Sequence, residues 1–245
     1  MKNYKMIIQY EGTRYKGWQK QGNTNNTIQE KFENILHEMT GKKTEIIASG
    51  RTDAGVHALA QTANFKCDTN KNCGEIMDYF NKYLPDDIAV LSVDEVDLRF
   101  HSRLNAKSKT YEYSLCAINK PDVFTRRTVY YIDVCPDTEK MRIASQKLLG
   151  THDFKGFSSL GKTKKSTVRT INSIEITENG SYINIRINGS GFLYNMVRII
   201  AGTLLDIGLG KADAQCIDLI FNTGKRENAG ITLPSKGLKL VEVLY

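Results

Sequence analysis

The sequence predicts an α+β protein built from two similar halves with antiparallel sheets. Alternating apolar residues mark strands, most clearly over 182–188, and apolar residues at helical spacing mark amphipathic helices, beginning with the one that starts at Ile28. The order strand–helix–strand–strand–helix–strand then occurs twice along the chain. Ferredoxin-like and RNA-recognition domains have this order, and 245 residues are enough for two such halves with hydrophobic cores.

The N-terminal half is predicted to span residues 1–104. Thr27 and Glu30 fit a capping box, in which Thr27 accepts from the first free amides and Glu30 reaches back. Gly41 is a plausible end for the helix that follows, and Pro85 closes the second helix. The predicted elements are strands over 4–10, 45–48, 60–65 and 88–96, with helices over 28–40 and 75–83.

The C-terminal half is predicted to span residues 105–245. Its first strand carries Tyr111 and Tyr113, and its first helix ends at Gly150. The predicted elements are strands over 109–117, 168–177, 182–188 and 238–244, with helices over 137–149, 192–207 and 212–222. We expect the sheets of the two halves to abut.

Composition favours a folded protein with a polyanionic partner. Hydrophobic residues make up 40% of the chain and charged residues 25%, which is typical of soluble globular proteins. Lys and Arg outnumber Asp and Glu by 34 to 27, a net charge of +7 that fits binding to a polyanion. No apolar run is long enough to cross a bilayer, and the N-terminal apolar run is too short for a signal peptide. We therefore expect a cytoplasmic protein.

The cysteines and histidines do not suggest a metal site. Neither residue type has the spacing of a metal-binding motif, and the number of cysteines is odd, so we expect free thiols in a reducing compartment and no metal. They are Cys67, Cys73, Cys116, Cys135 and Cys216, and His37, His57, His101 and His152.

The segment GRTDAGVHA at residues 50–58 carries a single acid, Asp53. Two interpretations are open. Asp53 is a turn residue that bonds to its own downstream backbone, or it is a nucleophile or general base. In the second case Arg51 binds phosphate or the carboxylate, and Ala54 and Gly55 leave room for a planar ligand. His57 is a further candidate base.

Three basic stretches interleaved with aromatic residues suit RNA, because cations bind phosphates and aromatic faces stack on bases. Each stretch taken alone is also consistent with a solvated surface. They lie at residues 14–20, 99–113 and 162–169, and the candidate RNA-binding residues in them are Arg14, Lys16, Lys20, Arg103, Lys107, Lys109, Lys164 and Lys165.

Two further features concern residues later in the chain. Tyr111 and Tyr113 share one face of a predicted strand, so one belongs to the core and the other is available to a ligand. Arg198 lies within the apolar helix FLYNMVRIIAGTLL. It is either a snorkelling arginine or one that pairs with a carboxylate, for which Asp53 is a candidate.

The sequence resembles the tRNA pseudouridine synthase A family nearly end to end. The strongest match is GRTDAGVHA, and five further segments follow the family's order. Ser102 stands where the family often has Ala, and the segment from Pro234 also departs from the pattern. The five segments are YEGTRYKGWQKQ (10–21), FHSRLNAKSKTYEYSL (100–115), LLGTHDFKGFSS (148–159), GSGFLYNMVRIIAGTLLDIG (189–208) and LPSKGLKLVEVLY (233–245).

The resemblance implies a pseudouridine synthase fold and a catalytic site. Asp53 aligns with the family's nucleophilic aspartate, and Arg198 with the arginine that pairs with it. Tyr111 aligns with the tyrosine that stacks on the target base. Members isomerise uridine at tRNA nucleotides 38, 39 and 40 in the anticodon arm, need no cofactor, and are homodimers.

The resemblance also implies binding roles. Leu238 aligns with an apolar residue that lines the pocket, and Arg51 is expected to contact the backbone of the target nucleotide. His57 becomes a structural residue that supports the loop. Two other functions stay open: a related synthase acting on ribosomal RNA, and a tRNA-folding chaperone without catalysis.

Overall fold

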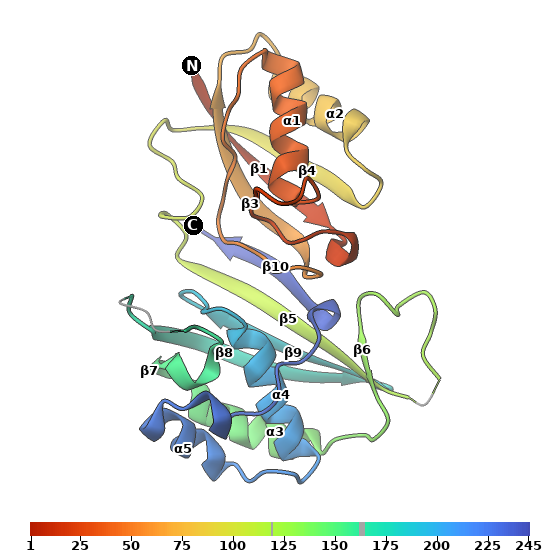
Figure 1. Cartoon of the computed structure of the whole chain (residues 1–245), viewed down its shortest axis with the longest axis vertical. Coiled ribbons are helices and arrows are strands. Elements are labelled where there is room, and N and C mark those ends of the chain that lie inside the picture. Colours follow the sequence, from red (N-terminus) through yellow and green to blue (C-terminus); the bar gives the residue numbers. More distant parts are fainter. Residues whose placement is uncertain (119, 162–164) are drawn as a thin grey trace. The chain divides into compact units, whose positions relative to one another are not determined.

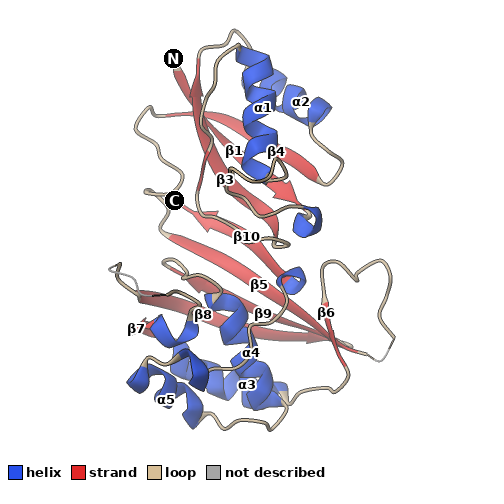
Figure 2. Ribbon diagram, in the orientation of Figure 1, coloured by secondary structure: helices blue, strands red, loops and turns tan. Residues whose placement is uncertain are grey.

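The computed structural model describes residues 1–118, 120–161 and 165–245 (Figure 1). Internal contacts divide the chain into two units, residues 1–107 with 239–245, and residues 108–238. Each unit combines helices with a mostly antiparallel sheet (Figure 2), which confirms the predicted α+β class. Among the residues described, no helix has the length and apolar character needed to pass through a membrane.

The first unit contains four neighbouring strands and a short fifth strand that pairs with one of them. Its elements are β1 (Lys2–Tyr10), α1 (Ile28–Thr40), β2 (Ile47–Ala48), β3 (His57–Cys67), α2 (Cys73–Tyr83), β4 (Ile88–Val96) and β10 (Leu238–Leu244). The strand order is β4-β1-β3-β10, and β2 pairs with β3. β1 is antiparallel to both of its neighbours, so that Met6 lies opposite Ala63 on one side and Val93 on the other.

The last strand lies in a different place from the one predicted. The sequence predicts it in the C-terminal half, whereas β10 runs parallel to β3, with Lys239 opposite His57 and Leu240 opposite Ala58. Residues 239–245 therefore group with the first unit. Alternation along a strand predicts that it has a buried face, but not which sheet edge it joins.

Aromatic packing holds the helices of the first unit on their sheet. Phe32 of α1 lies 5.4 Å from Phe80 of α2, and Phe80 lies 5.9 Å from Phe65 of β3, measured between ring centroids. Trp18 stacks on Phe32 from the loop after β1. All four side chains are buried. Burial of apolar surface stabilises a fold by roughly 25 cal/mol per Å², so this cluster is a major source of the unit's stability.

The predicted capping box is only half formed. The Thr27 side chain accepts from the Glu30 amide, as expected for an N-cap. The Glu30 carboxylate instead lies 3.7 Å from the Lys20 ammonium, and its Oε2 is buried with no hydrogen-bond partner in the described part of the chain. A complete box is found at α2, where Asn72 and Glu75 cap each other's backbone amides.

The strands of the second unit follow the order β5-β9-β8-β7, and β6 runs parallel to β5. The elements of this unit are β5 (Ser108–Ala117), β6 (Tyr130–Ile132), α3 (Thr138–Ser145), β7 (Gly150–Asp153), β8 (Val168–Asn179), β9 (Tyr182–Gly189), α4 (Met196–Gly208) and α5 (Gln215–Thr223). The predicted hairpin is present, because β8 and β9 pair antiparallel up to Asn179 and Tyr182.

The predicted helices of the second unit differ from the structure in their bounds, and two short strands are additional to the prediction. The helix predicted from Phe192 begins at Met196, because Asn195 has a left-handed backbone conformation that a right-handed helix cannot continue. The helix predicted over 137–149 ends at Ser145 and continues as a 3-10 turn over Gln146–Leu148. The short strands β6 and β7 were not predicted, because three or four residues are too few to show a period.

Replacing Ser102 with alanine should stabilise the protein. Its hydroxyl is fully buried without a hydrogen-bond partner among the described residues, and its main chain is held by Asn64 and Tyr245. Removing an unsatisfied buried hydroxyl should raise the free energy of unfolding by about 1 kcal/mol, as measured by urea denaturation. The control is Ser49→Ala, because the equally buried Ser49 hydroxyl donates to Gln61 at 2.7 Å; that variant should lose stability. Equal effects in the two variants would contradict the prediction.

Candidate functional site

The segment around Asp53 is fixed by hydrogen bonds to the loop that follows β1. Trp18 N–H donates to the Thr52 carbonyl at 2.9 Å, and Gly55 N–H donates to the Tyr15 carbonyl at 3.3 Å. Gly12 N–H donates to Nδ1 of His57 at 2.9 Å. We call these contacts between residues 12–18 and 52–57 the seam. It gives an irregular loop the backbone pairing that a strand would otherwise supply.

The turn at Asp53 is closed by its main chain. Val56 N–H donates to the Asp53 carbonyl at 3.1 Å, and Gly55 adopts a φ of +76°, which glycine reaches without strain. Asp53 is half-buried, while Arg51 and Ala54 are exposed. Because a backbone hydrogen bond closes the turn, the interpretation of Asp53 as a turn residue is compatible with its interpretation as a nucleophile or general base.

Polar side chains of β1 and β3 hold the turn by hydrogen bonds. The Tyr10 hydroxyl lies 2.8 Å from Oγ1 of Thr52, and burial raises the pKa of Tyr10 to about 12. Tyr10 therefore stays protonated at neutral pH. The Gln61 side-chain amide also donates to the Gly50 carbonyl, at 2.9 Å. Two residues that precede Asp53 are thus tied to β1 and β3.

His57 fits a supporting role better than a catalytic one. It is 5% exposed, and its Nδ1 accepts from Gly12 N–H. The same nitrogen lies 3.5 Å from Oε1 of Glu11. A ring nitrogen that accepts a hydrogen bond from an amide carries no proton that it could donate to the carboxylate. The shorter contact with Gly12 therefore makes Nδ1 an acceptor, and the contact with Glu11 is not an ion pair.

The basic residues of the first loop differ in what they contact. Nε of Arg14 donates to Asp87 at 2.7 Å, and the Tyr15 hydroxyl donates to the same carboxylate at 2.5 Å. Burial acts to raise the pKa of Asp87, but these two hydrogen bonds outweigh it and hold the pKa below its usual value. Lys20 lies near Glu30 and Glu33. Lys16 is exposed.

The other predicted RNA-binding residues are distributed over both units. Arg103 and Lys107 are exposed in the first unit. In the second unit Lys165 is exposed and Lys109, on β5, is half-buried. Lys164 lies outside the described residues, as does its neighbour Lys162.

The two tyrosines of β5 have different surroundings. Tyr113 is fully buried, and its hydroxyl donates to the Pro234 carbonyl at 2.7 Å. Burial raises its pKa strongly, so it is the core member of the pair. Tyr111 is 8% exposed and meets the Phe192 ring edge-to-face at 5.2 Å. Phe192 therefore restricts the orientation of the Tyr111 ring.

Arg198 is held by two neutral acceptors of its own unit. Its Nε donates to the Leu233 carbonyl at 2.6 Å, and its Nη1 donates to Oδ1 of Asn195 at 2.8 Å. The side chain is half-buried on an otherwise apolar helix. The guanidinium is thus fixed in direction rather than extended freely into solvent, as a snorkelling side chain would be. The predicted pairing of Arg198 with Asp53 stays a prediction.

The predicted site residues are divided between the units. Asp53 and Arg51 belong to the first unit, and Tyr111 and Arg198 belong to the second. Leu238, the first residue of β10, is the last residue of the second unit, and the rest of β10 belongs to the first. Leu238 is 6% exposed and follows a 3-10 turn over Ser235–Gly237. Nowhere among the described residues do three or more His, Cys, Asp or Glu side chains gather as they would around a metal ion.

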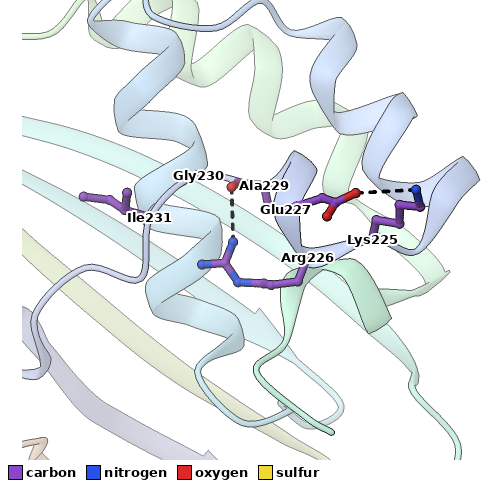
Figure 3. Close-up of a pocket in the computed structure, with 6 residues that line it drawn as sticks. All are labelled: Lys225, Arg226, Glu227, Ala229, Gly230 and Ile231. Carbon is purple, nitrogen blue, oxygen red and sulfur yellow. Dashed lines mark hydrogen bonds and ion pairs between the residues drawn. The ribbon is translucent and has the colours of Figure 1, made fainter. Parts of the chain in front are cut away.

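An open pocket in the second unit contains none of these residues. It is formed by the segment Lys225–Ile231, where Lys225 pairs with Glu227 at 3.4 Å and Arg226 donates to the Ala229 carbonyl at 3.1 Å (Figure 3). Its cations are thus already matched by acceptors of the same segment, and we assign it no catalytic role.

Sequence patterns missed three residues that shape the site. Asp87 joins Arg14 and Tyr15, Tyr10 supports Thr52, and Asn195 holds Arg198. The first two act through contacts between distant parts of the chain, which leave no local pattern. Asn195 did have a local signal, since asparagine is among the few residues that enter the left-handed region.

Replacing Gly17 with alanine should displace the Asp53 segment. Gly17 has a φ of +93°, and an added Cβ would lie 2.7 Å from the Thr52 carbonyl oxygen. The strain should cost about 1–3 kcal/mol of stability and lower activity, measured by urea denaturation and by the rate of the catalysed reaction. The control is Gly22→Ala in the same loop, where nothing lies within 4 Å of the added Cβ. A Gly17→Ala variant as stable and active as the control would contradict the role of the seam.

The comparisons with known proteins agree on one family. A family model described as tRNA pseudouridine synthase matches residues 6–105 and 144–245. The chain is 44% identical to tRNA pseudouridine synthase A 2 of Bacillus cereus, over 100% of both chains, and 49% identical to tRNA pseudouridine synthase A of a Bacillus species, over 94% of both. A protein of the latter name from Acetivibrio thermocellus is 44% identical over 100% of both chains.

Among solved structures, a chain of a Cbf5-Nop10-Gar1 complex aligns with 97% of this chain and 48% of its own length. The sequence identity is 13% and the TM-score 0.39, too low for an inference about fold or function. The sequence matches, by contrast, cover both units of the chain and extend over 94% to 100% of the length of these relatives. The chain therefore belongs to the tRNA pseudouridine synthase family.

Proposed function

We propose that this protein converts uridine to pseudouridine in the anticodon arm of tRNA, at nucleotides 38, 39 and 40, with Asp53 as the nucleophile. The observation that carries the proposal is a carboxylate on a fixed, glycine-containing turn within a chain that belongs to this family in both units. A catalytic group must be held close to its productive position, and the seam supports that requirement for the backbone of Asp53.

The reaction is an isomerisation. The C1′–N1 glycosidic bond breaks, the uracil turns, and a C1′–C5 bond forms; the proton lost from C5 is balanced by the proton gained at N1. No electrons are gained or lost overall, so the balance calls for no redox cofactor. Asp53 acts by one of two routes: it adds to the sugar or base, or it removes the C2′ proton to give a glycal.

The target uridine must leave its stack before Asp53 can reach it, at a cost of a few kcal/mol. Tyr111 is proposed to stack on the extruded base, which would offset about 1–3 kcal/mol of that cost. The edge-to-face contact with Phe192 supports this role. A ring that is already oriented loses less conformational freedom when the base arrives.

Arg198 is proposed to pair with Asp53 and keep its carboxylate ionised. A nearby cation favours the charged form of a carboxyl group. The bonds from Arg198 to Leu233 and Asn195 support the proposal, because they orient the guanidinium within its own unit. Leu238 is proposed to line the uridine pocket, and Arg51 to contact the backbone of the target nucleotide.

The net charge of +7 supports binding to the phosphates of tRNA. The cations proposed to contact RNA are Arg14, Lys16, Lys20, Arg103, Lys107, Lys109, Lys164 and Lys165. Arg14 has a competing partner in Asp87, so its removal is expected to affect stability as well as binding. We further propose that the protein is a cytoplasmic homodimer.

Asp53→Asn should abolish the reaction, because it removes the nucleophile while retaining the size of the side chain. A loss of at least about 10,000-fold is typical when a nucleophile is removed, and tRNA binding should persist. The measurement is carbodiimide-blocked primer extension on tRNA from cells that carry the wild-type gene, the gene with the Asp53→Asn substitution, or no gene. Normal turnover in the variant would refute the role of Asp53.

The same mapping distinguishes the other functions. Pseudouridine that depends on the gene only in ribosomal RNA would identify a synthase with another substrate. Binding of tRNA without any gene-dependent pseudouridine would identify a folding chaperone. Positions other than 38, 39 and 40 would correct the proposed target nucleotides.

Arg198→Ala should lower both stability and the rate of the chemical step. The Leu233 carbonyl and Asn195 lose their donor, which should cost about 1–3 kcal/mol of unfolding free energy, and the single-turnover rate should fall by about 100-fold or more. Arg198→Lys retains the charge but not the planar fork, so its rate should lie between those of Arg198→Ala and wild type. An unchanged melting temperature together with an unchanged rate would contradict the assignment.

A further inference from the structure

Asn195 has an unusual backbone conformation next to a predicted catalytic residue. Among the described residues it is the one non-glycine with a positive φ, at +61°, with a ψ of 5°. A side chain in this left-handed region is strained relative to glycine. Such strain persists only where the surrounding contacts maintain it, and it is concentrated at functional sites.

The Asn195 side chain bridges two partners. Its Oδ1 accepts from Nη1 of Arg198 at 2.8 Å, and its Nδ2 donates to Oγ of Ser159 at 3.0 Å. The direction of the amide follows from its partners, since a guanidinium can only donate. The neighbouring backbone is tied to the same segment, because Ser159 N–H donates to the Tyr194 carbonyl at 3.1 Å.

The side chain makes this bridge in place of the usual interaction at a helix start. An asparagine that precedes the first helical residue normally accepts a hydrogen bond from an amide in the first turn. Asn195 precedes α4 but makes no such side-chain bond. In the left-handed conformation, the Asn195 side chain therefore contacts Arg198, one turn along the helix, instead of capping the helix.

We propose that Asn195 is a positioning residue that orients Arg198 toward the catalytic carboxylate. The Leu233 carbonyl accepts from Nε of Arg198 and Asn195 accepts from Nη1. These two bonds engage Nε and Nη1 and fix the plane of the guanidinium. The inference rests on the proposed function, in which the guanidinium pairs with Asp53.

Asn195→Gly is the sharpest test, because glycine adopts the left-handed conformation without strain and removes only the bridge. Losing a hydrogen bond to a charged group should lower the single-turnover rate by about 10- to 100-fold, while the Kd for tRNA stays unchanged. The control is Asn228→Gly, which removes an amide-to-hydroxyl bond of 2.8 Å to Thr223 on the surface of the same unit; its rate should equal that of wild type. A wild-type rate for Asn195→Gly would overturn the proposal.

A double-mutant cycle separates positioning from a general structural role. If Asn195 acts through Arg198, Asn195→Gly should cost little further rate in an Arg198→Lys background, because effects of coupled residues are not additive. Equal losses in both backgrounds would show that the residue acts independently of Arg198 and would overturn the proposal.

Ser159→Ala provides a second variant if Asn195→Gly fails to fold. It removes the partner of Nδ2 at an exposed residue, so the rate should fall several-fold when Arg198 is present and stay unchanged in the Arg198→Lys background. An unchanged rate with Arg198 present would count against the bridge.

Asp53→Asn distinguishes failure of the proposed function from failure of the positioning role. Activity in Asp53→Asn refutes the proposed function, whereas an inactive Asp53→Asn beside a fully active Asn195→Gly refutes the positioning role alone.

Discussion

The hydrogen bond from the Trp18 amide to the Thr52 carbonyl is the interaction on which the position of the Asp53 segment depends. It anchors the residue before Asp53 to a loop whose own position is fixed by burial of Trp18 against Phe32. A residue on an irregular loop lacks the ladder of backbone hydrogen bonds that a strand provides. The seam replaces that ladder, and the aromatic cluster of the first unit supports the seam.

In the second unit, hydrogen bonds likewise fix the position of a cation, the Arg198 guanidinium. Arg198 lies on an apolar helix, where a partly desolvated guanidinium needs acceptors. Neutral groups satisfy it: the Leu233 carbonyl and the Asn195 amide. Neutral acceptors orient the group without cancelling its charge, whereas a carboxylate of the same unit would do both. This arrangement suits a residue that is proposed to act on a carboxylate elsewhere.

Elements with a clear period were well predicted, and those decided by single long-range contacts were not. The helix from Ile28 to Thr40 and the hairpin of β8 and β9 follow directly from their apolar spacing. The start of the helix before Arg198 was wrong by four residues. Its apolar spacing continues through Phe192 and Leu193, and only the backbone of Asn195 interrupts it.

For the candidate site residues, the sequence indicated which side chains could bind or react, but it did not indicate their hydrogen-bond and ion-pair partners. Arg14 reads as a free cation in a basic loop, but Asp87 lies beside it in the fold. His57 reads as a possible base, but it accepts a bond from Gly12 in a buried position. The partners lie far along the chain in both cases, so no local spacing reveals them.

The sequence by itself determined the α+β class, the family and the candidate residues, because apolar periods and ordered motifs are local properties of a chain. Only the tertiary structure decided that the last strand pairs with β3, that the seam holds the backbone of Asp53, and that Asn195 leaves the helical conformation to contact Arg198. These features depend on backbone groups and side chains satisfying one another across the fold, and that complementarity is a property of the folded chain.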